Sequence, residues 1–174
     1  MTTIKLLGSI VIIASSALIG LEYSRKYTER LNNLIYIQNC IQMLETEIVY
    51  SSNQLPDALE NIYVKGNKRV SFLFNDIKEY LLNNKDKSLF ESFEHNLAKS
   101  KNKLFLQNDD IEVILSLGRV LGTSDTLDQQ KHFKTAIMNL EISQNDAKEI
   151  RDKNGKMYRS LGALFGIALA IILY

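Results

Sequence analysis

The residue types that carry out chemistry in proteins are few in this sequence and lie far apart. Its 174 residues include two histidines, His95 and His132, and one cysteine, Cys40. A structural zinc site uses four ligands, mostly Cys and His, and a di-iron bundle uses two Glu-x-x-His pairs. The sequence supplies neither set, and it also lacks the phosphate-binding pattern G-x-x-x-x-G-K-[ST]. We therefore predict no catalytic residue, no cofactor-binding residue and no metal ligand, and we predict that the protein is not an enzyme.

Two groups of polar residues are candidates for contact with another protein or another helix. Glu45 and Glu47 lie late in a stretch with helical periodicity, and Gln130 and His132 follow Asp125, a favourable helix N-cap. Glu45 and Glu47 fit either a solvated helix face or an acidic edge that contacts a partner or a neighbouring helix. Gln129, Gln130 and His132 fit hydrogen bonding along a seam between two helices.

These groups belong to a polar middle region between two apolar ends. Residues 6–21 form one uncharged run and residues 161–174 form another. With Ile4 and Lys5 the first run has about 18 residues, or ~27 Å of helix, close to the ~30 Å hydrocarbon thickness of a bilayer. The second run alone gives ~21 Å, which becomes ~27 Å if the helix begins at Met157. We predict membrane anchors at 1–21 and 160–174, and a helical domain at 22–159.

Each apolar end also fits a second interpretation. Lys5, the apolar stretch and the small residues 14–17 are typical of a cleaved signal peptide. An anchor is favoured because the run continues to Leu21 and is followed by Arg25 and Lys26, as in a stop-transfer flank. The second end fits either a full span or a half-inserted helix, and the similar length of the first anchor favours a span.

The basic residues beside the runs predict the orientation. Lys5 lies on the outer side of the first run. Seven basic residues lie on the inner sides of the two runs: Arg25, Lys26, Arg30, Arg151, Lys153, Lys156 and Arg159. Because Lys and Arg are enriched in cytosolic segments, we predict a two-pass protein of the cell membrane with a cytosolic middle domain and both termini outside.

Small residues recur at every fourth position within the runs. They are Ser16 and Gly20 in the first run, and Gly162, Gly166 and Ala170 in the second. Such spacing lets helix backbones approach closely in lipid. It predicts packing of the two runs against each other or against a partner, although Gly and Ala are also common throughout membrane helices.

The middle region has the apolar periodicity of helices, and no useful length of it alternates with period two. Pro56 suits the first turn of a helix, Ser88 and Glu91 form a capping box, and Asp109 and Asp110 are predicted to cap a further helix. The predicted breaks fall at residues 51–54, 66–67, 83–86 and 122–125. We predict an all-α fold, a bundle of about six helices whose first and last helices are continuous with the transmembrane segments.

The composition excludes some classes of function. The chain has 21 basic and 20 acidic residues, so it lacks the basic excess that is usual in nucleic-acid-binding proteins. One cysteine permits no internal disulfide and fits a reducing compartment. We predict no nucleic-acid partner.

Several short motifs together resemble one protein family along the whole chain. They are KYTER (26–30), LETEIVY (44–50), LPDA (55–58), LGTSD (121–125), QQKH (129–132) and KNGKMYRSLG (153–162). In these motifs and in its two apolar ends the sequence resembles the stage III sporulation protein AB family of endospore-forming Firmicutes. It departs from the family at Asn32, where a proline is expected, and at Gly155, where a glutamate is usual.

The resemblance implies a place in an eight-protein sporulation complex of the mother cell. That complex forms a channel-like passage with a partner in the forespore membrane. The family is also similar to the cytosolic domains of the F-type platform protein of type II secretion. The resemblance therefore implies a membrane platform subunit that couples a cytosolic ATPase to other membrane subunits, located in the mother-cell membrane around the forespore.

Six polar residues are the candidates for contact with such partners: Glu29, Arg30, Glu45, Glu47, Gln130 and His132. Internal helix pairing fits each of them equally well. A homo-oligomer is compatible with the sequence. The alternative function is a small membrane-anchored helical sensor or scaffold without a permanent ATPase partner.

Overall fold

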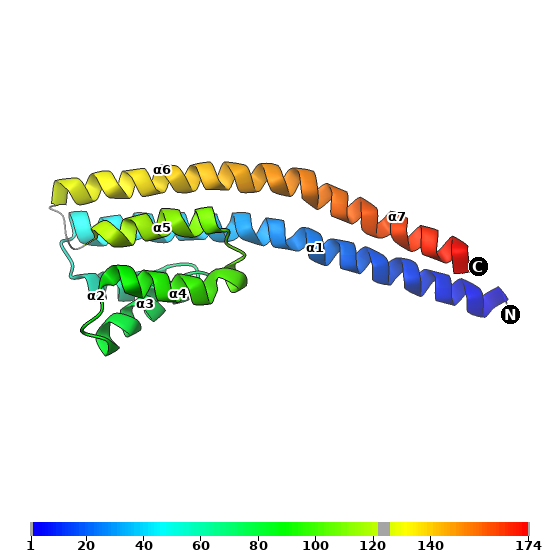
Figure 1. Ribbon diagram of the computed structural model, residues 1–174, viewed down its shortest axis with the longest axis horizontal. Coiled ribbons are helices and arrows are strands. Elements are labelled where there is room, and N and C mark those ends of the chain that lie inside the picture. Colours follow the sequence, from blue (N-terminus) through cyan, green and yellow to red (C-terminus); the bar gives the residue numbers. More distant parts are fainter. Residues whose placement is uncertain (1, 122–125, 174) are drawn as a thin grey trace. The chain divides into compact units, whose positions relative to one another are not determined.

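All regular structure that is described in this chain is helical. The structure is a computed structural model, which describes the backbone of residues 2–121 and 126–173. In order, the helices are α1 (Thr2–Glu45), the π-helical turn η1 (Thr46–Tyr50), α2 (Leu55–Lys65), α3 (Phe72–Asn83), α4 (Leu89–Leu104), α5 (Asn108–Val120), α6 (Thr126–Ile150), the π-helical turn η2 (Arg151–Gly155) and α7 (Lys156–Leu173) (Figure 1). The predicted all-α fold is confirmed.

The first and last helices are long, as predicted. α1 includes the N-terminal apolar run without a break, and α6, η2 and α7 follow one another directly into the C-terminal run. The predicted break at 122–125, with Asp125 as a helix cap, lies outside the described residues.

The chain divides into two compact units. A terminal unit comprises Met1–Leu31 and Asp146–Tyr174, and a central unit comprises Asn32–Asn145. The predicted domain limits at 21 and 159 mark where the chain would enter the membrane, whereas the two units are defined by packing. These limits therefore stay predictions.

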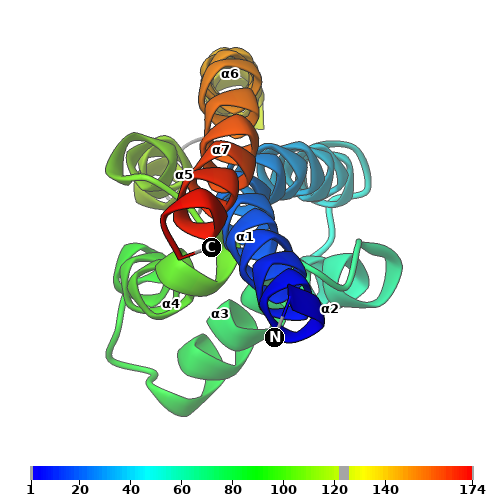
Figure 2. The ribbon, with the colours of Figure 1, turned by 90° about the vertical axis from the view of Figure 1, so that its right-hand side faces the viewer.

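The central unit has a core of aliphatic and phenylalanine side chains. In it α2 packs on α3, α3 on α4, and α4 on α5 (Figure 2). The fully buried side chains recur at steps of three and four along each helix, as an amphipathic helix requires. They include Leu34, Ile37, Ile41, Leu59, Ile62, Leu73, Phe74, Ile77, Phe93, Leu97, Phe133 and Leu140.

Local capping chemistry starts the helices of this unit. The predicted capping box of α4 is confirmed: the Glu91 backbone N–H donates to Ser88 Oγ (3.2 Å), and the Ser88 N–H donates to the Glu91 carboxylate (2.8 Å). At α5 the prediction is wrong in one respect, because Gln107 is the N-cap. Asp110 lies in the first turn there and accepts the Gln107 N–H at 2.8 Å.

Candidate functional site

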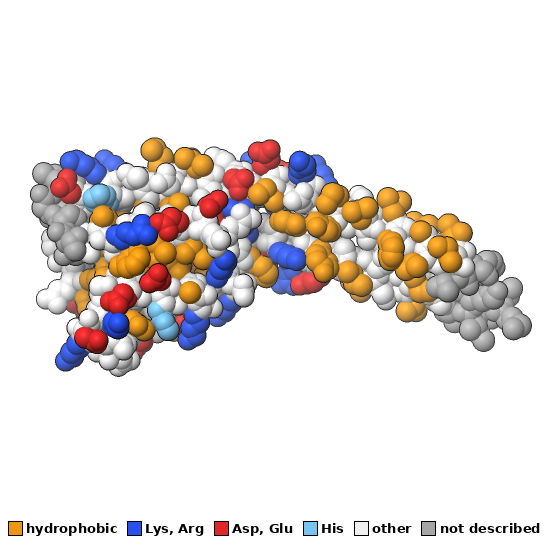
Figure 3. All heavy atoms as spheres, in the orientation of Figure 1, with side chains coloured by type: hydrophobic (Ala, Val, Ile, Leu, Met, Phe, Trp, Pro, Cys, Tyr) orange, Lys and Arg blue, Asp and Glu red, His pale blue; other side chains and the backbone are white. Residues whose placement is uncertain are grey.

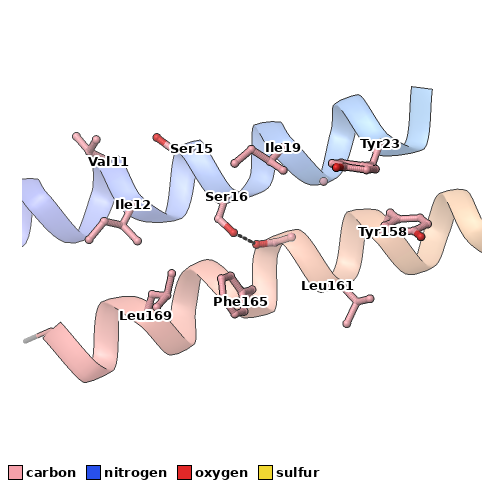
Figure 4. Close-up of a pocket in the computed structure, with 12 residues that line it drawn as sticks. Val11, Ile12, Ser15, Ser16, Ile19, Tyr23, Tyr158, Leu161, Phe165 and Leu169 are labelled. Carbon is pink, nitrogen blue, oxygen red and sulfur yellow. Dashed lines mark hydrogen bonds between the residues drawn. The ribbon is translucent and has the colours of Figure 1, made fainter. Parts of the chain in front are cut away.

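Glycines bring the backbones of α1 and α7 close together in the terminal unit, where the two helices run in opposite directions (Figure 4). A Cβ atom placed on Gly20 would lie 2.6 Å from the Tyr158 carbonyl oxygen and 3.0 Å from Gly162 Cα. A Cβ placed on Gly166 would lie 2.9 Å from Ile13 Cα. Because no side chain fits at these distances, the close approach requires glycine. We call this contact the glycine seam.

Two serines add polar contacts along the glycine seam. Ser16 Oγ donates to the Gly162 carbonyl oxygen at 2.6 Å (Figure 4). Ser24, which is 2 % exposed, accepts a hydrogen bond from Arg159 Nε at 3.0 Å. Both bonds satisfy hydroxyl groups that packing removes from solvent.

The structure thus brings four of the five predicted packing residues into one seam: Ser16, Gly20, Gly162 and Gly166. The fifth, Ala170, is buried farther along α7, beside a small groove that Ile13 also lines. Their packing inside a membrane stays a prediction.

Next to the glycine seam, α1 and α7 also contact each other through stacked tyrosine rings, which the sequence analysis did not predict. The Tyr158 ring lies 5.8 Å from the Tyr23 ring and 6.0 Å from the Tyr27 ring, and both pairs are nearly parallel. The Lys26 ammonium lies 4.3 Å from the centre of the Tyr23 ring, within cation–π range. Tyr23 and Tyr27 are four residues apart on α1, and this spacing was the available signal.

Of the six partner candidates, Glu29 and Arg30 belong to the terminal unit, where both form ion pairs. Arg30 Nη1 lies 3.2 Å from the Asp146 carboxylate, and its side chain is only 6 % exposed. Glu29 lies 3.5 Å from Arg25 Nε on the next turn of α1. Arg30 therefore joins α1 to α6 within the terminal unit.

Glu47 lies in η1 and joins that turn to α2 and the loop before it. Its carboxylate accepts hydrogen bonds from Lys65 Nζ (3.0 Å), Asn53 Nδ2 (2.6 Å) and Asn61 Nδ2 (2.8 Å). The hydrogen bond from Lys65, followed by those from the two asparagines, lowers the pKa of Glu47 from its usual 4.5. The internal contacts account for most of the bonding capacity of this carboxylate.

The other three candidates lie near the same end of the central unit. Gln130 Nε2 donates to the Tyr50 hydroxyl at 2.9 Å, which places the start of α6 beside η1. Glu45 and His132 are half-buried. The six candidates therefore do not form one site, and partner contact stays a prediction for each.

The sequence analysis also did not predict a pair of glutamines that joins α1 to α6. Gln144 Nε2 donates to Gln38 Oε1 at 2.8 Å, and Gln38 Nε2 donates to the Ile137 carbonyl oxygen at 3.2 Å. The two glutamines are more than a hundred residues apart, so no local sequence signal points to their contact.

The terminal unit exposes much apolar surface. In Figure 3 its hydrophobic side chains gather toward the end that carries both termini, and charged side chains gather toward its other end. The helical segment Asp128–Ile172 is long and apolar enough to cross a membrane. Within the described side chains, no group of three or more His, Cys, Asp or Glu could hold a metal ion.

The sequence and the fold of this chain are both similar to those of known proteins. The model of the stage III sporulation protein AB family matches residues 5–174. The chain belongs to this family. It is 35 % identical to stage III sporulation protein AB of Bacillus subtilis (strain 168) over 170 residues, which are 98 % of this chain and 99 % of the relative. A solved structure of stage III sporulation protein AB is 32 % identical and superposes with a TM-score of 0.64, covering 71 % of this chain and 96 % of the other.

Replacing Gly20 by leucine is expected to separate α1 from α7 in this family member. The added side chain would collide with backbone atoms of α7, so the helices must move apart, at a cost of about 1–3 kcal/mol for overpacking. Spin labels on Leu18→Cys and Leu164→Cys, both exposed positions, would report a longer and broader distance distribution by pulsed EPR.

Gly8→Leu is the matched control, since nothing lies within 4 Å of a Cβ placed there. Cys40 stays unlabelled because it is 1 % exposed and burial raises the pKa of its thiol to about 11. Equal distance distributions in the two leucine variants would contradict the glycine seam.

The Glu47 contacts predict acid sensitivity of the central unit. A carboxyl group whose pKa is lower in the folded state stabilises the fold above its unfolded pKa, and this contribution is lost as the pH falls through the folded value. Urea unfolding of the full chain in detergent micelles should therefore need less urea below about pH 4.5. Glu47→Gln should weaken that pH dependence.

Glu45→Gln is the control, because Glu45 makes none of the three hydrogen bonds of Glu47. Some acid sensitivity should remain in both variants, because the Ser88 N–H and the neighbouring Lys87 lower the pKa of Glu91 to about 2. A Glu47→Gln protein with the full pH dependence of the parent would count against the role of these contacts.

Proposed function

We propose that this chain is a non-enzymatic platform subunit of a sporulation membrane complex, held in the mother-cell membrane by both of its ends. The observation that carries the proposal is the glycine seam. In lipid, helices gain little from burying apolar side chains, so close backbone contact and hydrogen bonds must hold them together. The seam supplies both through Gly20, Gly162 and Ser16. The family to which the chain belongs supports the role in sporulation.

The basic flanks support a cytosolic middle domain. Arg25, Lys26 and Arg30 follow the first run, and four more basic residues precede the second. With α1 and α7 antiparallel in the terminal unit, both ends enter one bilayer from the same side. Under this proposal the termini lie outside the mother-cell cytosol.

The proposal also includes coupling to a cytosolic ATPase, and this part rests on the family resemblance. Both connections between the two units are helical, since α1 continues through Leu31 and α6 through Asp146. Helical connections can carry a displacement from one unit to the other. We expect the ATPase to contact the end of the central unit near η1, where Tyr50 is 66 % exposed and Glu45 and His132 are half-buried.

The orientation predicts a sided labelling pattern. Lys85 is exposed between α3 and α4, so a Lys85→Cys variant should react with a membrane-impermeant maleimide in inverted membrane vesicles. In right-side-out vesicles it should react only after the membrane is opened. A Thr3→Cys variant should show the reverse pattern. Labelling of Lys85→Cys in intact right-side-out vesicles would overturn the cytosolic placement.

Co-purification tests the coupling role. The tagged full chain, extracted from sporulating cells in mild detergent, should retain a cytosolic ATPase and other membrane subunits. The double variant Glu45→Lys, His132→Ala should lose the ATPase, whereas Lys85→Ala, in the loop between α3 and α4, should keep it. Recovery of the unmodified chain alone, with the complex intact elsewhere, would instead favour an anchored sensor or scaffold.

A further inference from the structure

An apolar groove lies beside the glycine seam in the terminal unit. It has a volume of about 670 Å³, and its walls come from α1 and α7 (Figure 4). Ile12 and Ile19 line it from α1, and Leu161, Phe165 and Leu169 line it from α7. The walls are almost entirely hydrocarbon, so the groove suits an apolar occupant.

The length of the groove matches one leaflet of a bilayer. On α1 its lining extends from Val11 to Tyr23, a separation of 12 residues. At ~1.5 Å per residue this is ~18 Å of helix, and half of the ~30 Å hydrocarbon core is ~15 Å. An acyl chain that lies along the groove would therefore cover it from one end to the other.

One end of the groove is aromatic and positively charged. Tyr23 and Tyr158 stack there, and the Lys26 ammonium lies over the Tyr23 ring. Tyrosine rings favour the membrane–water interface, where a phospholipid carries its phosphate. The groove thus ends at the depth where a headgroup is expected.

The charges at this end are only partly neutralised within the chain. Arg25, Arg30 and Arg151 form ion pairs with carboxylates of the terminal unit. Lys26, Lys153, Lys156 and Arg159 pair with no carboxylate among the described residues. A net positive charge therefore remains in this part of the terminal unit, and Lys26 carries it to the tyrosine that lines the groove.

We infer that this groove binds one acyl chain of an anionic phospholipid from the inner leaflet, with the lipid phosphate beside Lys26 and the Tyr23–Tyr158 stack. A phospholipid supplies both required parts in one molecule, a hydrocarbon chain as long as a leaflet is thick and a negative charge at interface depth. The inference rests on the membrane placement proposed above, and the experiment distinguishes a failure of that placement from a failure of the lipid site.

The test uses quenching of a single tryptophan by brominated lipids. The chain has no tryptophan, so Phe165→Trp places one indole in the groove, and Leu164→Trp places one at an equally exposed position that does not line it. The full-length variants are reconstituted in vesicles of phosphatidylcholine and phosphatidylglycerol, with bromine on the acyl chains of one lipid at a time.

At position 165 brominated phosphatidylglycerol should quench at about fivefold lower mole fraction than brominated phosphatidylcholine, the effect expected of one basic side chain near the surface. At position 164 the two lipids should quench equally. Lys26→Gln should remove the preference at 165. Lys103→Gln should leave it intact, although it too removes a lysine that lies over an aromatic ring, that of Phe72 in the central unit.

Three results would overturn the lipid site. Equal quenching by both lipids at 165 would show that unselected lipid fills the groove. Quenching at 164 but not at 165 would show that another helix, from a partner or a second copy, covers it. A preference that survives Lys26→Gln would remove the assigned phosphate contact. Absence of quenching at both positions would instead overturn the membrane placement.

Discussion

The close approach of Gly20 to Gly162 is the constraint on which the terminal unit depends. If Gly20 and Gly162 carried side chains, the α1 and α7 backbones could not come near enough for Ser16 to reach the Gly162 carbonyl oxygen. The Tyr158 ring could not then stack with Tyr23 and Tyr27. The groove is a consequence of the same contact, because two helices that touch along small residues leave their larger side chains to form walls on either side of the line of contact.

The π-helical turn η2 keeps Ala147 and Gly155 on the same side of the last helix. Ala147 and Gly155 are both buried and are eight residues apart, whereas two α-helical turns contain 7.2 residues. A π-turn takes up one extra residue, so both positions remain on the buried side. A Cβ atom placed on Gly155 would lie 3.2 Å from Ser24 Oγ. Gly155 thus lies where α1 comes near.

The sequence predicts the features that depend on near neighbours. Helical periodicity gives the all-α fold, and the Ser88–Glu91 capping box is correct because both halves lie within four residues. Asp109 and Asp110 were wrongly predicted to cap α5. Gln107 is the N-cap, although glutamine is not a preferred residue there, and Asp110 instead accepts the Gln107 N–H from the first turn. The Gln38–Gln144 pair depends on how distant helices pack, and single-sequence reasoning has no access to that. The same holds for the internal bonds of Arg30 and Glu47, whose charges look available in the sequence.

These internal ion pairs reduce the charge that is available to attract lipid, but they do not weaken the orientation preference. Seven basic residues beside the runs support the predicted orientation, because that tendency follows the number of Lys and Arg residues and acidic residues contribute little to it. Attraction to a lipid phosphate depends instead on the basic residues that have no carboxylate partner, because an ion pair within the protein already neutralises a basic side chain. Arg30 is the clearest case, being 6 % exposed and bonded to Asp146. The orientation can therefore depend on all seven residues while the attraction to lipid depends on the four that lack a carboxylate partner, and Lys26 is the one whose ammonium lies over the tyrosine at the mouth of the groove.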